Sequence, residues 1–510
     1  MLVDPLPIPS DAALAEVRRH FAERHAAAVA PSLVYGVIAG GTLVDSFGFG
    51  DMDGHGTVPT ADTAYRIASM TKSFTAAALL LLRDQGALSL DAPITDFVPA
   101  FADVRLPTND SPVPTLRMLA TMSAGLPGDD PWADRQEALT DDELDAVLRA
   151  GVRFVFVPGT EFEYSNLGYA LLGRAIQVAA GRRYHDVVMD EIIRPLGLAS
   201  TRFTADVAAP DVPAADVPAV GGVTVGGVTV GGVAVGFDHV DDAWASMPFS
   251  GPGAFSPIGG LFSTVTDIAA WAQFFLDAHR GTTTGPLSPA SRREMQQAQR
   301  LVPPTNAMSD GLSVGYGLGL VLTHDPEHGP IISHSGGYPG FSSHMRWHPA
   351  TGIGIVALEN ATYAGVGRPA AEALRAILAT VETRPAVRAW PEAVAAQATV
   401  SALLQSWDDA LAADLFSENI ELDEPIERRR AAIGRALEQT GALGANLDGN
   451  SDFANDRTWS ISGEHADLRC ELTLSPLVPP RVQTLEVTVQ AHAPEQHQQV
   501  AEQPEADAPG

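Results

Sequence analysis

Apolar and polar positions follow two different periodicities near the amino end of the chain, first that of strands and then that of a helix. Residues 33–38 and 42–49 are rich in β-branched and aromatic side chains and flank Ala39-Gly40-Gly41, which predicts a β-hairpin. From Ser69 onward the pattern is helical and soon becomes apolar on every side. The sequence therefore predicts a buried central helix that begins at Ser69 and ends at Gly86.

Helical patterns dominate from this helix to about residue 277, and strand patterns return after residue 310. The predicted helices cover 141–150, 167–180 and 266–276, the late strands cover 315–322, 331–335, 342–347 and 352–358, and a further helix covers 369–379. Strands at both ends with helices between them predict one sheet built from both ends of residues 1–384. The expected fold class is α/β, an antiparallel sheet with flanking helices in a sandwich and an inserted helical domain. Such an arrangement leaves a cleft between its two parts.

The composition changes again beyond residue 384. Residues 385–492 combine a helical pattern with short strand-like runs, which predicts a small α+β appendage, and residues 493–510 have the composition of a disordered tail. Inside the first region, residues 208–236 contain a nearly perfect Gly-Gly-Val-Thr-Val repeat. We interpret it as an inserted surface loop or ribbon. A lid over the cleft is the alternative interpretation, because long loops often gate active sites.

The bulk properties exclude several kinds of partner. A chain of 510 residues needs two or more folded units. The formal net charge of −30 argues against nucleic acid or an anionic membrane as a partner, because both attract Lys and Arg. Cys470 is the only cysteine, so an intrachain disulfide or a thiolate metal cluster is impossible. No secretory signal or membrane-spanning run is apparent, so we expect a cytoplasmic protein. Its oligomeric state stays open.

Lysine is almost absent from this chain. Of the 32 Lys and Arg residues 31 are arginine, so Lys72 is the only lysine. Arginine keeps its proton in proteins, whereas a buried lysine can release one. The single retained lysine therefore indicates proton chemistry at this position.

Ser69 precedes Lys72 by three residues, in Ser69-Met70-Thr71-Lys72. At helical spacing the two side chains lie on one face, and the helix N-terminus adds backbone N–H groups near the serine hydroxyl. A lysine with a lowered pKa can accept the serine proton. We therefore predict that Ser69 is a nucleophile activated by Lys72; the alternative is an exposed helix lysine without a role.

Two further motifs carry groups suited to the same reaction. Tyr164-Ser165-Asn166 offers a phenol that can move protons and an amide that can contact a substrate amide. His334-Ser335-Gly336-Gly337 closes a predicted strand, and its small residues allow a substrate to lie along the strand edge. A backbone N–H there can join that of Ser69 as an oxyanion hole. His334 can pair with a substrate carboxylate or help to move protons.

The three motifs, in this order, resemble those of the penicillin-recognising serine hydrolases. That group includes class C β-lactamases, D-Ala-D-Ala carboxypeptidases, D-aminopeptidases and related esterases, and the resemblance covers roughly residues 15–380. Supporting stretches lie at 65–68, 115–127, 168–173, 194–198, 259–264 and 340–343. The resemblance implies a β-lactamase-like sandwich and an acyl-enzyme mechanism without metal or organic cofactor.

The same resemblance implies a role for each candidate site residue. These are Ser69 as nucleophile, Lys72 as general base or proton relay, Tyr164 as second acid or base, Asn166 as a substrate-amide contact, His334 where many relatives have lysine, Gly336 as a small residue beside the substrate, and the N–H groups of Ser69 and Gly337 as the oxyanion hole.

Two departures from the family pattern bear on the substrate. The third motif begins with histidine, as in D-peptidases and related hydrolases, and residues 121–125 carry Met and Ala where relatives often have His and Ser. We expect the second change to affect packing near the cleft. The expected substrates are small molecules or short peptides: D-amino-acid peptides, amides or small esters. A β-lactamase, or a non-catalytic protein that binds penicillin or peptidoglycan fragments, is the alternative.

Two other patterns compete with this interpretation. Residues 311–315, Gly-Leu-Ser-Val-Gly, match a nucleophile elbow centred on Ser313, but such an elbow requires a strand before the serine and a helix after it. Here a glycine-rich strand pattern follows. The histidines at 324–348 suggest a metal, yet their spacing matches no known ligand set, and Pro326 prevents a helical arrangement. We expect no metal.

Overall fold

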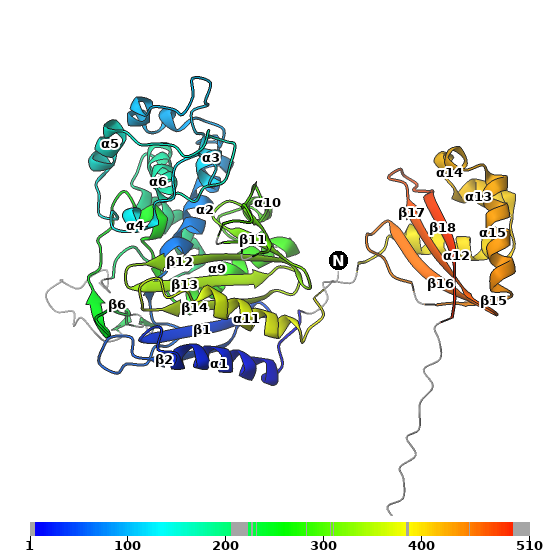
Figure 1. Cartoon of the computed structure of the whole chain (residues 1–510), viewed down its shortest axis with the longest axis horizontal. Helices are drawn as coiled ribbons and strands as arrows, with labels where there is room; N and C mark the ends of the chain where they lie inside the picture. The colour runs from blue at the N-terminus through cyan, green and yellow to red at the C-terminus, as the bar shows by residue number, and fades with distance from the viewer. Residues whose placement is uncertain are drawn as a thin grey trace, which may run out of the picture. The chain divides into compact units, whose positions relative to one another are not determined.

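In the computed structural model, one eight-stranded antiparallel sheet is built from both ends of residues 1–384 (Figure 1). β1 pairs with β14 from Leu33 opposite Glu359 to Ile38 opposite Gly354, so the predicted joining of the two ends is confirmed. The strand order is β2 (Thr42–Gly50), β1 (Ser32–Ala39), β14 (Ile353–Glu359), β13 (Phe341–His348), β12 (Gly329–Tyr338), β11 (Val321–Asp325), β10 (Ser313–Tyr316) and β9 (Arg300–Leu301).

Helices cover both faces of the sheet and form the inserted helical part. The helices of this region are α1 (Asp11–Ala26), α2 (Thr71–Asp84), α3 (Leu116–Ala120), α4 (Asp130–Ala133), α5 (Asp141–Ala150), α6 (Asn166–Ala180), α7 (Tyr184–Val188), α8 (Ser256–Gly259), α9 (Val265–Leu276), α10 (Pro289–Met295) and α11 (Gly367–Leu378). Figure 1 shows α1 and α11 along one side of the sheet and α3 to α6 gathered above β12 in this view.

Strand β1 is buried on both faces, which explains its continuous apolar run. Its residues Leu33, Tyr35 and Val37 belong to a core shared with α1 and α11. The opposite face packs on α9, and a Cβ added at Gly36 would lie only 2.4 Å from Val265 Cγ1. Helix α1 was not predicted, because it buries only a narrow stripe of apolar residues on an otherwise polar helix.

Helix α2 is the predicted central helix, and every residue from Thr71 to Leu82 is buried. Its start was predicted two residues too early. Ser69 lies in a single 3₁₀ turn, Ala68–Met70, immediately before the helix. Ala68 has a φ of 49°, a conformation that non-glycine residues rarely adopt and that is common at functional sites.

The prediction of one continuous strand at 315–322 is wrong, because these residues form a hairpin of two strands, β10 and β11. Gly317 N–H donates to Leu320 C=O across the turn, and Gly319 has a φ of 69°. A Cβ at Gly319 would lie 2.6 Å from the Lys72 carbonyl oxygen. The two glycines therefore allow a turn that packs tightly against the start of α2, which a strand periodicity cannot reveal.

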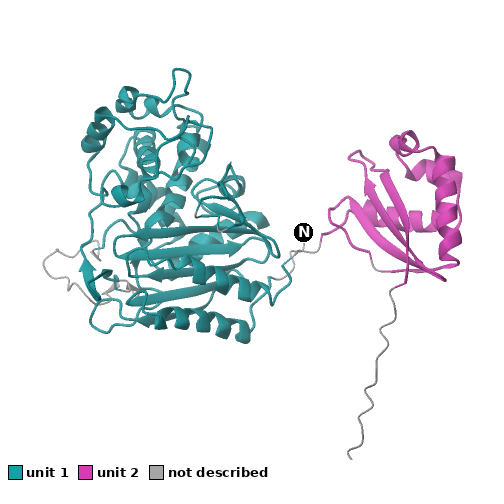
Figure 2. Cartoon of the chain, in the orientation of Figure 1, with its two compact units in different colours: residues 1–384 teal, residues 385–510 magenta. Residues whose placement is uncertain are grey.

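The chain divides into two compact units, residues 1–384 and 385–510 (Figure 2). The structure describes residues 6–205, 223–225, 228–230, 232–281, 283–306, 308–309, 311–383, 387–447 and 449–492. The predicted tail at 493–510 and much of the predicted loop at 208–236 lie outside these residues. Within that loop, the repeat forms a two-stranded pair, β4 (Val223–Val225) with β5 (Val228–Val230). Other short pairs are β3 (Tyr65–Arg66) with β8 (Phe262–Ser263), and β6 (Gly236–Val240) with β7 (Ala243–Met247).

The second unit has its own core beneath a four-stranded antiparallel sheet. Its elements are α12 (Pro391–Gln405), α13 (Asp409–Leu415), α14 (Glu418–Asp423), α15 (Ile426–Thr440), β15 (Leu443–Asn446), β16 (Asp456–Gly463), β17 (Asp467–Leu474) and β18 (Val482–Gln490). Cys470 is buried in this core, and burial raises the pKa of its thiol to about 12, so it is not a reactive nucleophile. None of the helices in the described part of the chain is long and apolar enough to cross a bilayer.

Candidate active site

Ser69 and Lys72 are in direct contact. Lys72 Nζ lies 2.9 Å from Ser69 Oγ and donates a second hydrogen bond, 3.0 Å long, to the carbonyl oxygen of Ile258 in α8. The lysine side chain is fully buried, whereas Ser69 is partly exposed between buried neighbours. The amine is therefore held beside a hydroxyl that a substrate can reach.

Burial shifts the protonation of Lys72 toward the neutral form. It lowers the pKa of the amine from 10.5 to about 8, against the opposing charges of Asp130, Asp134 and Asp129. The rings of Tyr164 and Tyr169, with centroids 4.9 and 5.8 Å from Nζ, also favour the charged form. The balance leaves an amine that titrates near neutral pH, as a general base requires.

We expect kcat to rise with pH through a midpoint near 8. Only neutral Lys72 can accept the serine proton, so protonation below its pKa of about 8 removes activity. The Asp130 carboxylate stabilises the charged form of the Lys72 amine and so raises its pKa. The variant Asp130→Asn should therefore move the midpoint to lower pH. Steady-state kcat between about pH 5 and pH 10 measures both effects. Activity that instead increases as pH falls through 8 would contradict this assignment.

Tyr164 lies over the Lys72 amine at the start of the second motif. Burial, and then the charge of Asp130, raise the pKa of its phenol well above 10, while hydrogen bonding to Ser69 opposes the shift. The phenol is therefore protonated at neutral pH and can donate a proton rather than remove one. The backbone N–H of Ser165 donates to Met122 Sδ at 3.4 Å, so the predicted packing effect of that unusual methionine falls on this motif.

Asn166 is the first residue of α6 and is completely buried. Its Nδ2 donates to Asp130 Oδ1, and its Oδ1 has no hydrogen-bond partner among the described residues. Asp129 caps the same helix, accepting the N–H groups of Asn166 at 2.7 Å and Leu167 at 2.9 Å. Two consecutive carboxylates thus fix the second motif at a helix N-terminus.

His334 lies close to this group, with its ring centroid 6.5 Å from that of Tyr164. It is 3% exposed, and burial lowers the pKa of its imidazole to about 3, with the Lys72 charge as the second cause. Its Nδ1 lies 2.6 Å from Ser335 C=O and its Nε2 lies 3.3 Å from Tyr316 Oη. A neutral imidazole held on both sides carries no positive charge to attract a substrate carboxylate, and the role of His334 at the site stays a prediction.

The strand that carries the third motif has an open edge. β11 pairs with β12 only as far as Ser333, and no strand of the described residues pairs with 334–338 on that side. The other edge pairs with β13, and one face of β12 packs against the turn before Ser69, since a Cβ added at Gly336 would lie 2.4 Å from the Ile67 carbonyl oxygen. An extended substrate can therefore add to this edge next to Ser69.

Gly336→Ala should lower kcat/KM by about 10²-fold, the loss typical of a displaced oxyanion donor. The new methyl group would lie 2.2 Å from Ser343 Oγ, so β12 must move away from the turn that carries Ser69. The matched control is Gly251→Ala, where a Cβ meets nothing within 4 Å. Equal kcat/KM for the two variants would show that the fit of β12 against this turn is unimportant.

A buried ion pair beside the site was not predicted. Arg66, three residues before Ser69, pairs with Glu137, and each side chain is 1% exposed. Glu137 also accepts hydrogen bonds from Tyr338 at 3.1 Å and from Ser256 at 3.4 Å. The pair therefore joins β3, β12 and α8 around the nucleophile. Arg66 lies in residues 65–68, one of the stretches that resemble the penicillin-recognising hydrolases, but nothing in the sequence marks Glu137 as its partner.

The competing patterns do not form a second site. Ser313 is an exposed residue of β10, which continues into the β11 hairpin and not into a helix. Asp325 pairs with Arg375 and accepts the N–H groups of Glu327 and His328 in a turn. No cluster of three or more potential metal ligands occurs in the described ranges of the chain.

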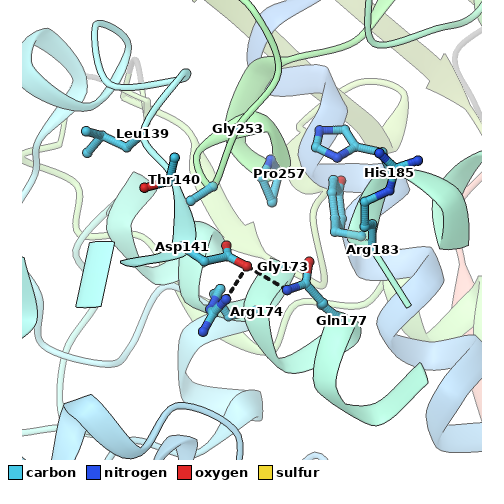
Figure 3. A pocket seen from close by; sticks show the side chains of 12 residues that line it. Leu139, Thr140, Asp141, Gly173, Arg174, Gln177, Arg183, His185, Gly253 and Pro257 are labelled. Carbon is cyan, nitrogen blue, oxygen red and sulfur yellow. Dashed lines mark hydrogen bonds and ion pairs between the residues drawn. The ribbon is translucent and has the colours of Figure 1, made fainter. Parts of the chain in front are cut away.

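A pocket of about 230 Å³ lies between α6, α7 and the segment leading into α8 (Figure 3). Asp141 pairs there with Arg174 and accepts a hydrogen bond from Gln177. None of the predicted catalytic side chains lines it. Its wall includes Pro257, the neighbour of the Ile258 whose carbonyl oxygen holds Lys72.

The fold and the motifs place the chain in one family. It belongs to the Beta-lactamase family, which matches residues 17–380. Penicillin-binding protein 4* of Bacillus subtilis is 28% identical over 305 residues, which cover 59% of this chain and 61% of that protein. D-alanyl-D-alanine-carboxypeptidase/endopeptidase AmpH of Escherichia coli is 28% identical over 316 residues, or 59% of this chain and 72% of AmpH. The family agrees with the resemblance that the three motifs indicated.

The fold resembles that of solved structures over most of the chain. The octameric penicillin-binding protein homologue from Pyrococcus abyssi has a TM-score of 0.59 at 22% identity, covering 91% of each chain. At this identity the likeness shows the fold alone, and it confirms the predicted β-lactamase-like architecture.

Proposed function

We propose that this chain is a serine hydrolase that forms an acyl-enzyme on Ser69. The single observation that carries the proposal is the buried lysine amine, 2.9 Å from the serine hydroxyl, whose pKa is lowered to about 8. Membership of the Beta-lactamase family supports it. The acceptor, the nucleophile and a proton donor, Tyr164, meet at one point, which is the arrangement acyl transfer requires.

The reaction proceeds in two halves. Ser69 Oγ attacks the substrate carbonyl carbon while its proton passes to Lys72, and the backbone N–H groups of Ser69 and Gly337 stabilise the oxyanion. Tyr164 then protonates the leaving amine or alcohol, and its own proton is restored from Lys72. Water attacks the acyl-enzyme by the same proton route and releases the acid. Asn166 and the open edge of β12 hold the substrate, and His334 positions this strand through its two contacts.

D-amino-acid peptides, amides or small esters are the proposed substrates. The name of AmpH, a D-alanyl-D-alanine-carboxypeptidase/endopeptidase, supports hydrolysis of peptide bonds between D-residues. The test is a panel of D-alanine p-nitroanilide, p-nitrophenyl acetate and nitrocefin with the wild type, Ser69→Ala and Ser313→Ala. We expect anilide or ester turnover above that of nitrocefin, a loss of about 10³-fold or more in Ser69→Ala, and none in Ser313→Ala. Turnover that survives Ser69→Ala would contradict the proposal.

A further inference from the structure

Tyr363 has a strained backbone in the segment between β14 and α11. Its φ is 48°, in the left-handed region that bulky side chains rarely adopt. Before it, Thr362 N–H donates to the Phe237 carbonyl oxygen at 2.9 Å. After it, Gly365 N–H donates to Ser342 Oγ at 3.0 Å. The segment is therefore fixed on both sides of the strained residue, and such strain is concentrated at functional sites.

The Tyr363 side chain bridges the sheet and the inserted helical part. Its ring packs on β12, because a Cβ added at Gly337 would lie 2.6 Å from Tyr363 Cδ1. Its hydroxyl donates a 2.6 Å hydrogen bond to Oδ2 of Asp134, the residue that directly follows α4. Asp134 is 4% exposed, whereas Tyr363 is 43% exposed. The tyrosine is therefore held at both ends while part of it stays accessible.

This bridge borders the reacting atoms. The Asp134 charge acts on both the Lys72 amine and the Tyr164 phenol. Burial raises the pKa of Asp134 to about 6, and the hydrogen bond from Tyr363 opposes this shift. On the strand side of the bridge, Gly337 carries one of the two N–H groups of the proposed oxyanion hole. Tyr363 therefore forms part of the wall of the cleft.

The proton donor and the oxyanion hole of the proposed reaction decide which part of a substrate meets the bridge. Tyr164, the donor to the leaving group, lies beside His334, with 6.5 Å between the ring centroids. The leaving group therefore lies toward His334, at one end of the open strand edge. From the carbonyl carbon the acyl group extends the other way, past Gly337 and toward Tyr363.

We propose that Tyr363 closes the acyl end of the cleft and limits the length of the acyl group that the enzyme accepts. The inference rests on the proposed function of Ser69 and adds the residue that sets its acyl specificity. A short acyl group ends before the ring. The chain of a longer acyl group must displace the ring and break its hydrogen bond to Asp134, so longer substrates react more slowly.

The test varies the acyl group and keeps the leaving group constant. The value of kcat/KM is measured for p-nitrophenyl acetate and p-nitrophenyl octanoate. In Tyr363→Ala the octanoate-to-acetate ratio should rise by roughly tenfold or more, the discrimination that one methylene group gives in an apolar pocket. Tyr363→Phe keeps the ring but loses the bond to Asp134, so the ratio should rise by a smaller factor.

Two controls accompany these variants. Phe47→Ala removes a ring of nearly equal exposure, 41%, from β2 and should keep the wild-type ratio. A second substrate pair, p-nitrophenyl acetate and 1-naphthyl acetate, shares the acyl group and differs in the leaving group. Tyr363→Ala should leave the ratio of this pair unchanged, because the leaving group lies toward His334. Circular dichroism checks that each variant is folded.

The outcomes separate the two proposals. The same octanoate-to-acetate ratio in the wild type and Tyr363→Ala, with Ser69 still required for turnover, overturns the role of Tyr363 and leaves the hydrolase intact. A change confined to the naphthyl pair overturns the placement of the acyl group. A wild-type ratio in Tyr363→Phe contradicts the part played by Asp134. Turnover of both esters that survives Ser69→Ala, or no turnover together with an unlabelled Ser69 after fluorophosphonate treatment, contradicts the hydrolase itself.

Discussion

Lys72→Arg is expected to reduce kcat by roughly 10³-fold or more, the scale of losing a catalytic base, while the protein stays folded. The substitution keeps a positive charge at a position that is buried and bonded to Ser69 and Ile258. Arginine cannot give up its proton near neutral pH, so it cannot accept the proton of Ser69. Turnover of an anilide or ester, with circular dichroism for the fold, measures the effect.

Two further variants control this result. Lys72→Met removes the buried amine and should also be inactive, but its Tm should equal or exceed that of the wild type, because the cost of desolvating a charge disappears. Arg117→Lys makes a conservative change of the same kind at an exposed pair with Asp91 and should leave kcat unchanged. Full activity in folded Lys72→Arg would show that this lysine is not a proton acceptor.

Arg66→Met is expected to lower the free energy of unfolding by about 3–5 kcal/mol, the usual cost of leaving a buried charge without its partner. Glu137 would remain buried beside Tyr338 and Ser256 with no cation to balance it. The Arg66 guanidinium also stacks on the ring of Phe262, with 4.7 Å to its centroid, so packing is lost as well. Urea unfolding followed by fluorescence measures the change.

The double variant separates charge from packing. Arg66→Met with Glu137→Gln removes both charges, so it should recover a large part of the lost stability. A double variant less stable than Arg66→Met alone would mean that Glu137 is not held mainly by Arg66 and would contradict this account of the pair.

Much of the fold follows from local patterns in the sequence. The β1–β2 hairpin, the buried helix α2 and the late strands were predicted because each has a strong periodicity or a glycine turn. Helix α1 was not predicted because its buried stripe is narrow. The turn between β10 and β11 was not predicted because the need for Gly319 comes from its close approach to the Lys72 backbone. Both depend on what lies opposite in space, which periodicity cannot supply.

The candidate site was also predicted in part, where the sequence motifs carry the signal, and missed where it depends on neighbours in space. Ser69, Lys72 and Tyr164 were found from chemistry and order along the chain, and the structure brings them together. The aspartates at 129, 130 and 134 were missed, although two adjacent acids directly after Pro127-Gly128 offered a signal. The neutral state of His334 could not be predicted, because a pKa depends on burial and neighbours rather than on the motif.

The most direct measurement is the position of the covalent adduct after treatment with a fluorophosphonate or penicillin probe, located by mass spectrometry of peptides. Either probe reacts with an activated hydroxyl, and Lys72 Nζ stands 2.9 Å from Ser69 Oγ. We expect a single adduct on Ser69 that is absent from Ser69→Ala and strongly reduced in Lys72→Arg. An adduct on Ser313 or another serine, with Ser69 unmodified, would contradict it.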